Sequence, residues 1–145
     1  MRIAIATDHA GFEFKEGMQA FLRGQGYDVL DLGTHNKDSV DYPDYAKLCC
    51  DAVLQGQARF GILICGSGIG MSIAANKIHG VRAALAHDLY TARMGRSHNN
   101  ANILVLPSRM IALTIATEMT ELFLNTPFEG GRHAGRVDKI MKLEC

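Results

Sequence analysis

The sequence predicts a single α/β domain whose sheet is five-stranded, parallel and doubly wound. Short, continuous apolar runs alternate along the chain with segments in which apolar residues recur at helical spacing. The runs are not broken by regularly spaced polar residues, which is typical of strands buried on both faces of a parallel sheet. The length of 145 residues suits one hydrophobic core. We therefore expect one domain over residues 1–145, with right-handed crossovers between strands.

Five apolar runs mark the expected strands. They span residues 3–6, 29–32, 61–65, 81–86 and 103–106, the second being shorter and more mixed. Sheets of this kind bind ligands at the carboxyl ends of their strands, near the point where the strand order reverses. The residues that directly follow the strands are therefore the candidate site residues.

The segments between the strands carry the helical pattern. In the first helix, expected over 14–22, Phe14, Met18 and Leu22 share one face, and Gly24 follows. Such a regular βα alternation is Rossmann-like. Comparable patterns predict the other helices over 45–53, 72–77, 89–94, 111–122 and 137–143.

Composition and charge disfavour several classes of protein. Apolar residues make up 48% of the chain and charged residues 21%, unlike a disordered chain or a coiled coil. Fifteen basic residues balance fifteen acidic ones, whereas proteins that bind nucleic acids or anionic membranes normally carry a basic excess. Asp8 and His9 interrupt the apolar stretch that a secretion signal needs, and no segment approaches the roughly 20 apolar residues of a membrane span. We expect a cytoplasmic protein without nucleic-acid or membrane partners.

Cysteine and histidine spacing gives no sign of a disulfide framework or a metal centre. Cys49, Cys50, Cys65 and Cys145 lack CxxC spacing, so we expect reduced thiols. The six histidines form no HxH or HExxH pattern, and we expect no metal and no cofactor. A site assembled from residues dispersed along the sequence stays open at this point.

The strongest local signal is ILICGSGIGMS, residues 62–72, in which a buried strand runs into a glycine-rich loop and then a helix. Glycine permits positive φ and close backbone approach, so successive N–H groups can converge on an anion. The GxGxG spacing departs from GxGxxG, and no Walker A lysine follows. Asp88 lies near the offset at which dinucleotide folds place an acid, so nucleotide binding is an alternative, as is a turn without a ligand. The loop comprises Gly66, Ser67, Gly68, Ile69 and Gly70.

Residues that follow the first and third expected strands are candidates for proton transfer. Cys65 precedes a helix, whose positive end stabilises a thiolate; a buried strand cysteine is the alternative. Asp8 and His9 can orient a sugar hydroxyl and move its proton, or can equally be a helix N-cap beside a solvated histidine. Tyr42, in DYPDYA, is either a sugar contact or an exposed loop residue.

The second half of the chain adds candidates for substrate binding. His98 and Asn99 lie in RSHNNAN, before the last expected strand, where polar residues are also common in ordinary loops. The segment GGRHAGR gathers Arg132, His133 and Arg136. Guanidinium groups suit bidentate phosphate binding, the alternative being a solvated tail.

Together these motifs resemble the ribose-5-phosphate isomerase type B family, which also includes allose-6-phosphate isomerase and the galactose-6-phosphate isomerase subunits. The resemblance covers nearly the whole chain and rests on DHAGF, DYPDYA, ILICGSGIGMSIAANK, RSHNNANIL and EGGRHAGRV. It implies a metal-free aldose–ketose isomerase that is a homodimer or a dimer of dimers, with each site shared between subunits.

The resemblance also implies a role for each candidate residue. Cys65 matches the base that removes the C2 proton, and His98 the residue that assists ring opening, for which Asp8 is also a candidate. The backbone from Gly66 to Gly70 matches the anion hole for the enediolate, and the Ser67 hydroxyl matches a catalytic hydrogen bond to this intermediate. Contacts to the sugar or its phosphate are matched by Asp8, His9, Asn99, Arg109, Arg132 and Arg136.

We therefore expect reversible conversion of D-ribose 5-phosphate to D-ribulose 5-phosphate, a reaction of the pentose phosphate pathway. Allose or galactose 6-phosphate is the alternative substrate, and a non-catalytic sugar-phosphate or nucleotide sensor is the alternative from another class. A sensor needs the glycine-rich loop and the arginines but gains nothing from Cys65 or His98.

Overall fold

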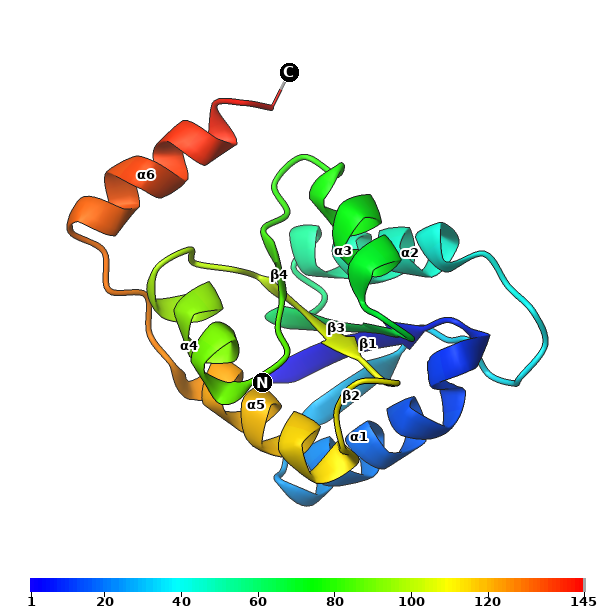
Figure 1. The fold of residues 1–145 in the computed structure, drawn as a ribbon. Coiled ribbons are helices and arrows are strands. Elements are labelled where there is room, and N and C mark those ends of the chain that lie inside the picture. The colour runs from blue at the N-terminus through cyan, green and yellow to red at the C-terminus, as the bar shows by residue number, and fades with distance from the viewer. Residues whose placement is uncertain (145) are drawn as a thin grey trace.

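The expected parallel sheet is present in a computed structural model, which describes residues 1–144. Its five strands lie in the order β2-β1-β3-β5-β4 (Figure 1). The five-stranded parallel α/β fold predicted from the apolar runs is thus confirmed. The strand bounds are β1 (Arg2–Thr7), β2 (Asp28–Asp31), β3 (Phe60–Cys65), β4 (Ala83–Leu85) and β5 (Ile103–Pro107).

Strand β4 is shorter than the predicted 81–86. The backbone N–H of Arg82 donates to the Asn102 side chain at 2.8 Å, and the pairing of β4 with β5 begins one residue later, at Ala83. At Arg82, the Asn102 side chain therefore takes the place of a backbone acceptor from the neighbouring strand. Cys145, the last of the predicted reduced thiols, lies outside the described residues.

The helices cover both faces of the sheet and differ from the predictions mainly at their ends. Helix α3 begins at Ile69 rather than at 72, so the end of the glycine-rich loop is already its first turn. Helix α6 begins at Arg132 rather than at 137, directly after Gly131 at a φ of 55°. The helices are η1 (His9–Gly11, 3-10), α1 (Phe12–Gly24), α2 (Tyr42–Leu54), α3 (Ile69–Asn76), α4 (Leu89–Ser97), α5 (Leu113–Asn125) and α6 (Arg132–Met141).

Alternating strand residues feed two separate cores, because successive side chains of a strand point to opposite faces. One core packs Ile62 and Ile64 with residues of α1, α4 and α5. The other packs Leu63 and Cys65 with residues of α2 and α3. Within the described residues, no helix is both long enough and apolar enough to cross a membrane.

A buried ion pair supports the carboxyl end of β1. Lys15 of α1 is fully buried, and its Nζ lies 2.6 Å from Asp31 Oδ1 at the end of β2. Asp31 also accepts from the Gly33 N–H at 3.0 Å and from Gln19 at 2.9 Å. Gly33 O in turn accepts from the Thr7 N–H at 2.7 Å. Partial burial raises the pKa of Asp31, but the bonds from Lys15, Gly33 and Gln19 outweigh it and hold that pKa below its ordinary value.

The first prediction concerns this ion pair. Lys15→Met keeps the buried stem but leaves Asp31 without its cation, so the free energy of unfolding should fall by about 3 kcal/mol in urea titrations. The matched change Lys47→Met, in the exposed pair with Asp51, should cost under about 0.5 kcal/mol. Because the Asp31 pKa is lowered in the folded state, its contribution is present above the unfolded value of 3.8 and is lost as pH falls through the folded pKa. Equal losses for the two variants would contradict the assignment.

Candidate active site

The carboxyl ends of β1, β3 and β5 enclose one cavity of about 550 Å³. It opens between β1 and β3, where the strand order reverses, as parallel α/β sheets lead one to expect. Most candidates from the first part of the chain meet there, together with Arg109 from the turn after β5. The lining residues are Asp8, His9, Ala10, Tyr42, Cys65, Gly66, Ser67, Gly70, Arg109 and Met110.

Cys65 ends β3 with its side chain on the α2–α3 face of the sheet and 5% of its surface exposed, in the lining of this cavity. Its carbonyl oxygen accepts from the backbone N–H of Ser108 at 2.9 Å and from the Ser108 hydroxyl at 3.3 Å. The strand end is therefore fixed by the neighbouring β5 turn. Ser108 was not among the predicted site residues, because its role depends on strand order.

The glycine-rich loop turns sharply into α3. Gly68 has a φ of 77°, and the Ser67 hydroxyl oxygen accepts from the Ile69 N–H at 3.2 Å. The first-turn amides of a helix have no acceptor within the helix, so the start of α3 is a position at which an anion can be bound. A Cβ on Gly70 would come within 2.6 Å of the Tyr42 ring, so this close approach requires glycine. The loop thus has the form of an anion site.

Asp8 and His9 combine the two alternatives that the sequence left open. Asp8 Oδ1 caps the η1 turn, accepting from the Ala10 N–H at 3.0 Å and the Gly11 N–H at 3.3 Å, while the residue also lines the cavity. His9 Nδ1 accepts from the Val40 N–H at 3.1 Å. In the neutral imidazole this bond places the proton on Nε2, which makes Nε2 a hydrogen-bond donor.

Tyr42 and Arg109 form the outer rim of the cavity. Tyr42 is the first residue of α2 and is 39% exposed, with its ring over Gly70. The Arg109 N–H donates to Gly66 O at 3.0 Å, and its side chain crosses the backbone of Gly66. A guanidinium group at this position can bind a substrate oxygen or phosphate.

Apart from Arg109, the candidates from the second half of the chain do not line this cavity. His98 follows α4, and exposed Arg132 and Arg136 lie one helical turn apart on α6. Figure 1 shows α6 standing apart from the layers of the domain. The structure therefore brings together only part of the predicted site within one chain.

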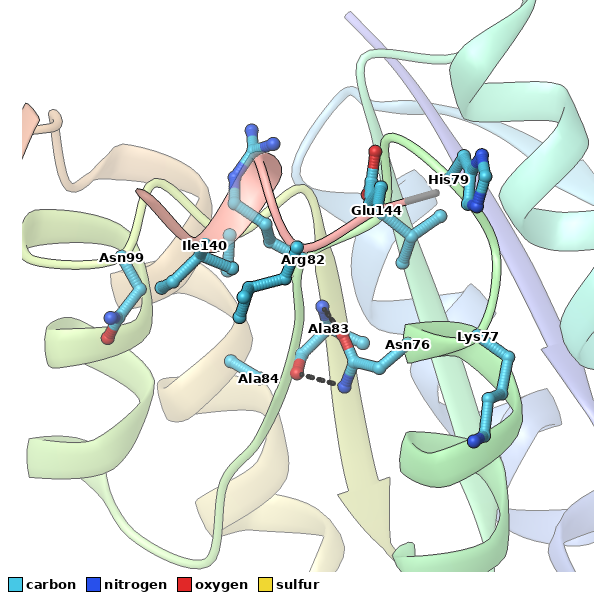
Figure 2. A pocket seen from close by; sticks show the side chains of 12 residues that line it. Asn76, Lys77, His79, Arg82, Ala83, Ala84, Asn99, Ile140 and Glu144 are labelled. Carbon is cyan, nitrogen blue, oxygen red and sulfur yellow. Dashed lines mark hydrogen bonds between the residues drawn. The ribbon is translucent and has the colours of Figure 1, made fainter. Parts of the chain in front are cut away.

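Asn99 lies beside a different and larger cavity of about 700 Å³ (Figure 2). In the close-up, Asn99 and Ile140 are on one side of this space, and Asn76 and Lys77 are on the other. The cavity lies at the amino end of β4, whereas ligands of parallel sheets bind at carboxyl ends. Its greater volume does not make it the better candidate for the chemistry.

A cluster that the sequence did not reveal surrounds His98. The His98 and His133 rings stack with centroids 4.1 Å apart, and both reach Glu129: Nε2 to Oε2 is 3.7 Å for His98 and 3.4 Å for His133. Partial desolvation, followed by the nearby His98, lowers the pKa of His133 despite Glu129. His98 and Glu129 are far apart in the sequence, so no local spacing announced this arrangement.

The other two described thiols are poor competitors for reaction at neutral pH. Burial raises the pKa of Cys49 well above its ordinary value. Burial, followed by the negative charge of Asp51, raises that of Cys50 to about 12. Both are core-facing residues of α2 and do not line the cavity of Cys65.

The comparisons with known proteins agree on one family. Residues 3–140 match the sequence profile of the Ribose/Galactose Isomerase family. The chain is 42% identical over 143 residues to the ribose-5-phosphate isomerase B of Escherichia coli K12, covering 99% of this chain and 96% of that protein.

Solved structures give the same result. A ribose 5-phosphate isomerase B from Thermotoga maritima is 55% identical, covers 97% of each chain and superposes with a TM-score of 0.96. A ribose-5-phosphate isomerase B from Mycoplasma genitalium with bound ribulose 5-phosphate is 42% identical and covers 99% of this chain and 95% of that chain, with a TM-score of 0.94.

The second prediction concerns the reactivity of Cys65. At neutral pH, iodoacetamide should alkylate Cys65 about tenfold or more faster than Cys49 and Cys50, because Cys65 lines an open cavity whereas burial raises the pKa of the other two thiols. Mass-spectrometric peptide mapping in a Cys145→Ser background measures each rate. Ribose 5-phosphate should protect Cys65. Slower labelling of Cys65 than of the two α2 thiols, with activity surviving full modification, would exclude it as the base.

Proposed function

The chain belongs to the Ribose/Galactose Isomerase family, and we propose that it interconverts D-ribose 5-phosphate and D-ribulose 5-phosphate. The observation that carries the proposal is a thiol at the end of β3 in one cavity with glycine-loop amides and the His9 imidazole. The relatives named above are isomerases of this kind, and one holds ribulose 5-phosphate. Membership of the family confirms the resemblance noted in the sequence.

The cavity suits proton transfer between adjacent carbons of a sugar. We assign the Cys65 thiolate as the base that takes the proton from C2, leaving a negative charge on O1 of the enediolate. Amide N–H groups of the glycine-rich loop, apart from that of Ile69, which donates to Ser67, stabilise this charge; one such donor is typically worth about 3 kcal/mol of the barrier. Cys65 then returns the proton to C1, while the O2 proton moves to O1. The same thiol thus serves first as base and then as acid.

A second subunit is proposed to complete the site. His98, Asn99, Arg132 and Arg136 are the natural ring-opening and phosphate-binding groups, yet they lie apart from the cavity of Cys65. Beside the glycine-rich loop, Ile69 and Ile73 expose 54% and 58% of their surfaces on one face of α3. An apolar pair at that position favours contact with a second copy. The proposed assembly is a homodimer, or a dimer of dimers.

The substrate contacts follow from this assembly. Arg132 and Arg136 of the second copy would bind the phosphate from one face of α6, and Arg109 would act from the rim of the cavity. The proposed cytoplasmic location is supported by Cys49, Cys50 and Cys65, which are unpaired thiols. The proposed mechanism uses no metal ion.

The third prediction tests the substrate. A coupled assay with ribose 5-phosphate, allose 6-phosphate and galactose 6-phosphate should give a kcat/KM at least about tenfold higher for the pentose. With the phosphate held at the same position, a sugar one carbon longer would place its C2 out of line with Cys65. Cys65→Ala is the matched control and should abolish turnover of every substrate. A hexose phosphate that turns over faster would replace the proposed substrate, and binding without turnover by the wild type would favour a sensor.

The fourth prediction tests the shared site. Cys65→Ala and His98→Ala homodimers should each be nearly inactive. When they are mixed equally and exchange subunits, about half of the dimers are mixed, and each mixed dimer has one intact pocket. Roughly a quarter of the wild-type activity should therefore return. Native mass spectrometry verifies the exchange; complete exchange with activity at background would place both residues in one chain's pocket.

A further inference from the structure

Three side chains outside the Cys65 cavity have the composition of a metal site. His98, Glu129 and His133 offer two imidazole nitrogens and a carboxylate oxygen that all lie within 4.8 Å of one another. We propose that they bind a divalent transition-metal ion, with Zn²⁺ the best match. Two histidines and one carboxylate, with a further position left open, are a ligand set that Zn²⁺ commonly takes.

The distances between the ligand atoms fit a single ion. Zn–N and Zn–O bonds of about 2.0–2.2 Å in a tetrahedron place neighbouring ligand atoms roughly 3.4 Å apart. Glu129 Oε2 lies 3.4 Å from His133 Nε2 and 3.7 Å from His98 Nε2. Because the two rings are stacked nearly parallel, one imidazole has to turn out of the stack before both nitrogen lone pairs can meet on one ion. His98, with 36% of its side chain exposed, is the ring with the freedom to turn.

The backbone holds the three ligands in place. The Glu129 N–H donates to Ser97 O at 3.0 Å, which joins the segment before α6 to the end of α4. The His98 N–H donates to Met94 O at 3.0 Å, and His133 is 7% exposed in the first turn of α6. Binding therefore requires little reordering of the chain, which favours affinity.

The charge of the three side chains suits a divalent cation. Glu129 is half exposed and supplies the negative charge that a cation prefers. With Glu129 as the third ligand, the ion keeps a net charge of +1 and an open position toward solvent.

The consequence for activity rests on the proposed function. An ion on His98 Nε2 would occupy the nitrogen that assists ring opening, so the metal would inhibit and not support turnover. Enzyme dialysed against EDTA should then be fully active, and Zn²⁺ should inhibit it reversibly.

The fifth prediction tests binding directly, with Co²⁺ as the probe, on the EDTA-treated full chain. Wild-type protein should give a visible d–d spectrum of one bound ion with nitrogen and oxygen ligands, displaced by Zn²⁺. Glu129→Gln and His133→Asn should each weaken Co²⁺ binding about tenfold or more, because each removes a ligand of the ion. Glu118→Gln and His87→Asn, which remove an exposed carboxylate and an exposed imidazole elsewhere, should leave binding unchanged.

The outcomes separate this proposal from the proposed function. A strong sulfur-to-cobalt charge-transfer band would place the ion on a cysteine and overturn the site, as would equal binding by Glu129→Gln and Glu118→Gln. Co²⁺ binding that shows the expected variant pattern, in a protein without isomerase activity, would support the metal site and refute only the function. Isomerase activity in a protein that does not bind Co²⁺ would support the proposed function and refute the metal site.

Discussion

Hydrogen bonding between β1 and β3 aligns Thr7 with Ile64, and the candidate site depends on this register. The Thr7 hydroxyl donates to Ile64 O at 2.9 Å, which secures the last pair of the ladder. Asp8 and Cys65 are the next residues of their strands, so the register brings a carboxylate and a thiol to the same edge. A slip of one residue would turn Cys65 toward the opposite core.

Several residues around this edge hold the cavity in place through hydrogen bonds. The Lys15–Asp31 pair supports Gly33, whose carbonyl oxygen accepts from the Thr7 N–H. Ser108 fixes the carbonyl group of Cys65 through two hydrogen bonds. Asp8 uses one oxygen as a cap, which orients the residue without removing it from the cavity. Because these supports are hydrogen-bonded and largely buried, the glycine-rich loop is presented in a preorganised form, the condition under which N–H groups stabilise a developing charge best.

The second half of the chain has a different character. Helix α6 stands apart from the layers of the domain (Figure 1). Its Arg132 and Arg136 are exposed, whereas His133 is 7% exposed and stacks on His98. The proposed dimer would bring these arginines to the Cys65 cavity of the second copy. Within one chain, the imidazoles of His98 and His133 form the proposed metal site with Glu129.

The amino-acid sequence by itself determined the fold class, the positions of the strands and the glycine-rich loop, because these depend on local periodicity and on residues adjacent in the chain. It also singled out Cys65, since a cysteine between a buried strand and a glycine-rich turn is a local pattern. Only the tertiary structure decided the strand order, the ends of β4 and α6, and the cluster of His98 with Glu129, because each depends on contacts between distant segments. It likewise showed that Asp8 both caps a turn and lines the cavity, a combination that no local pattern distinguishes from either role alone.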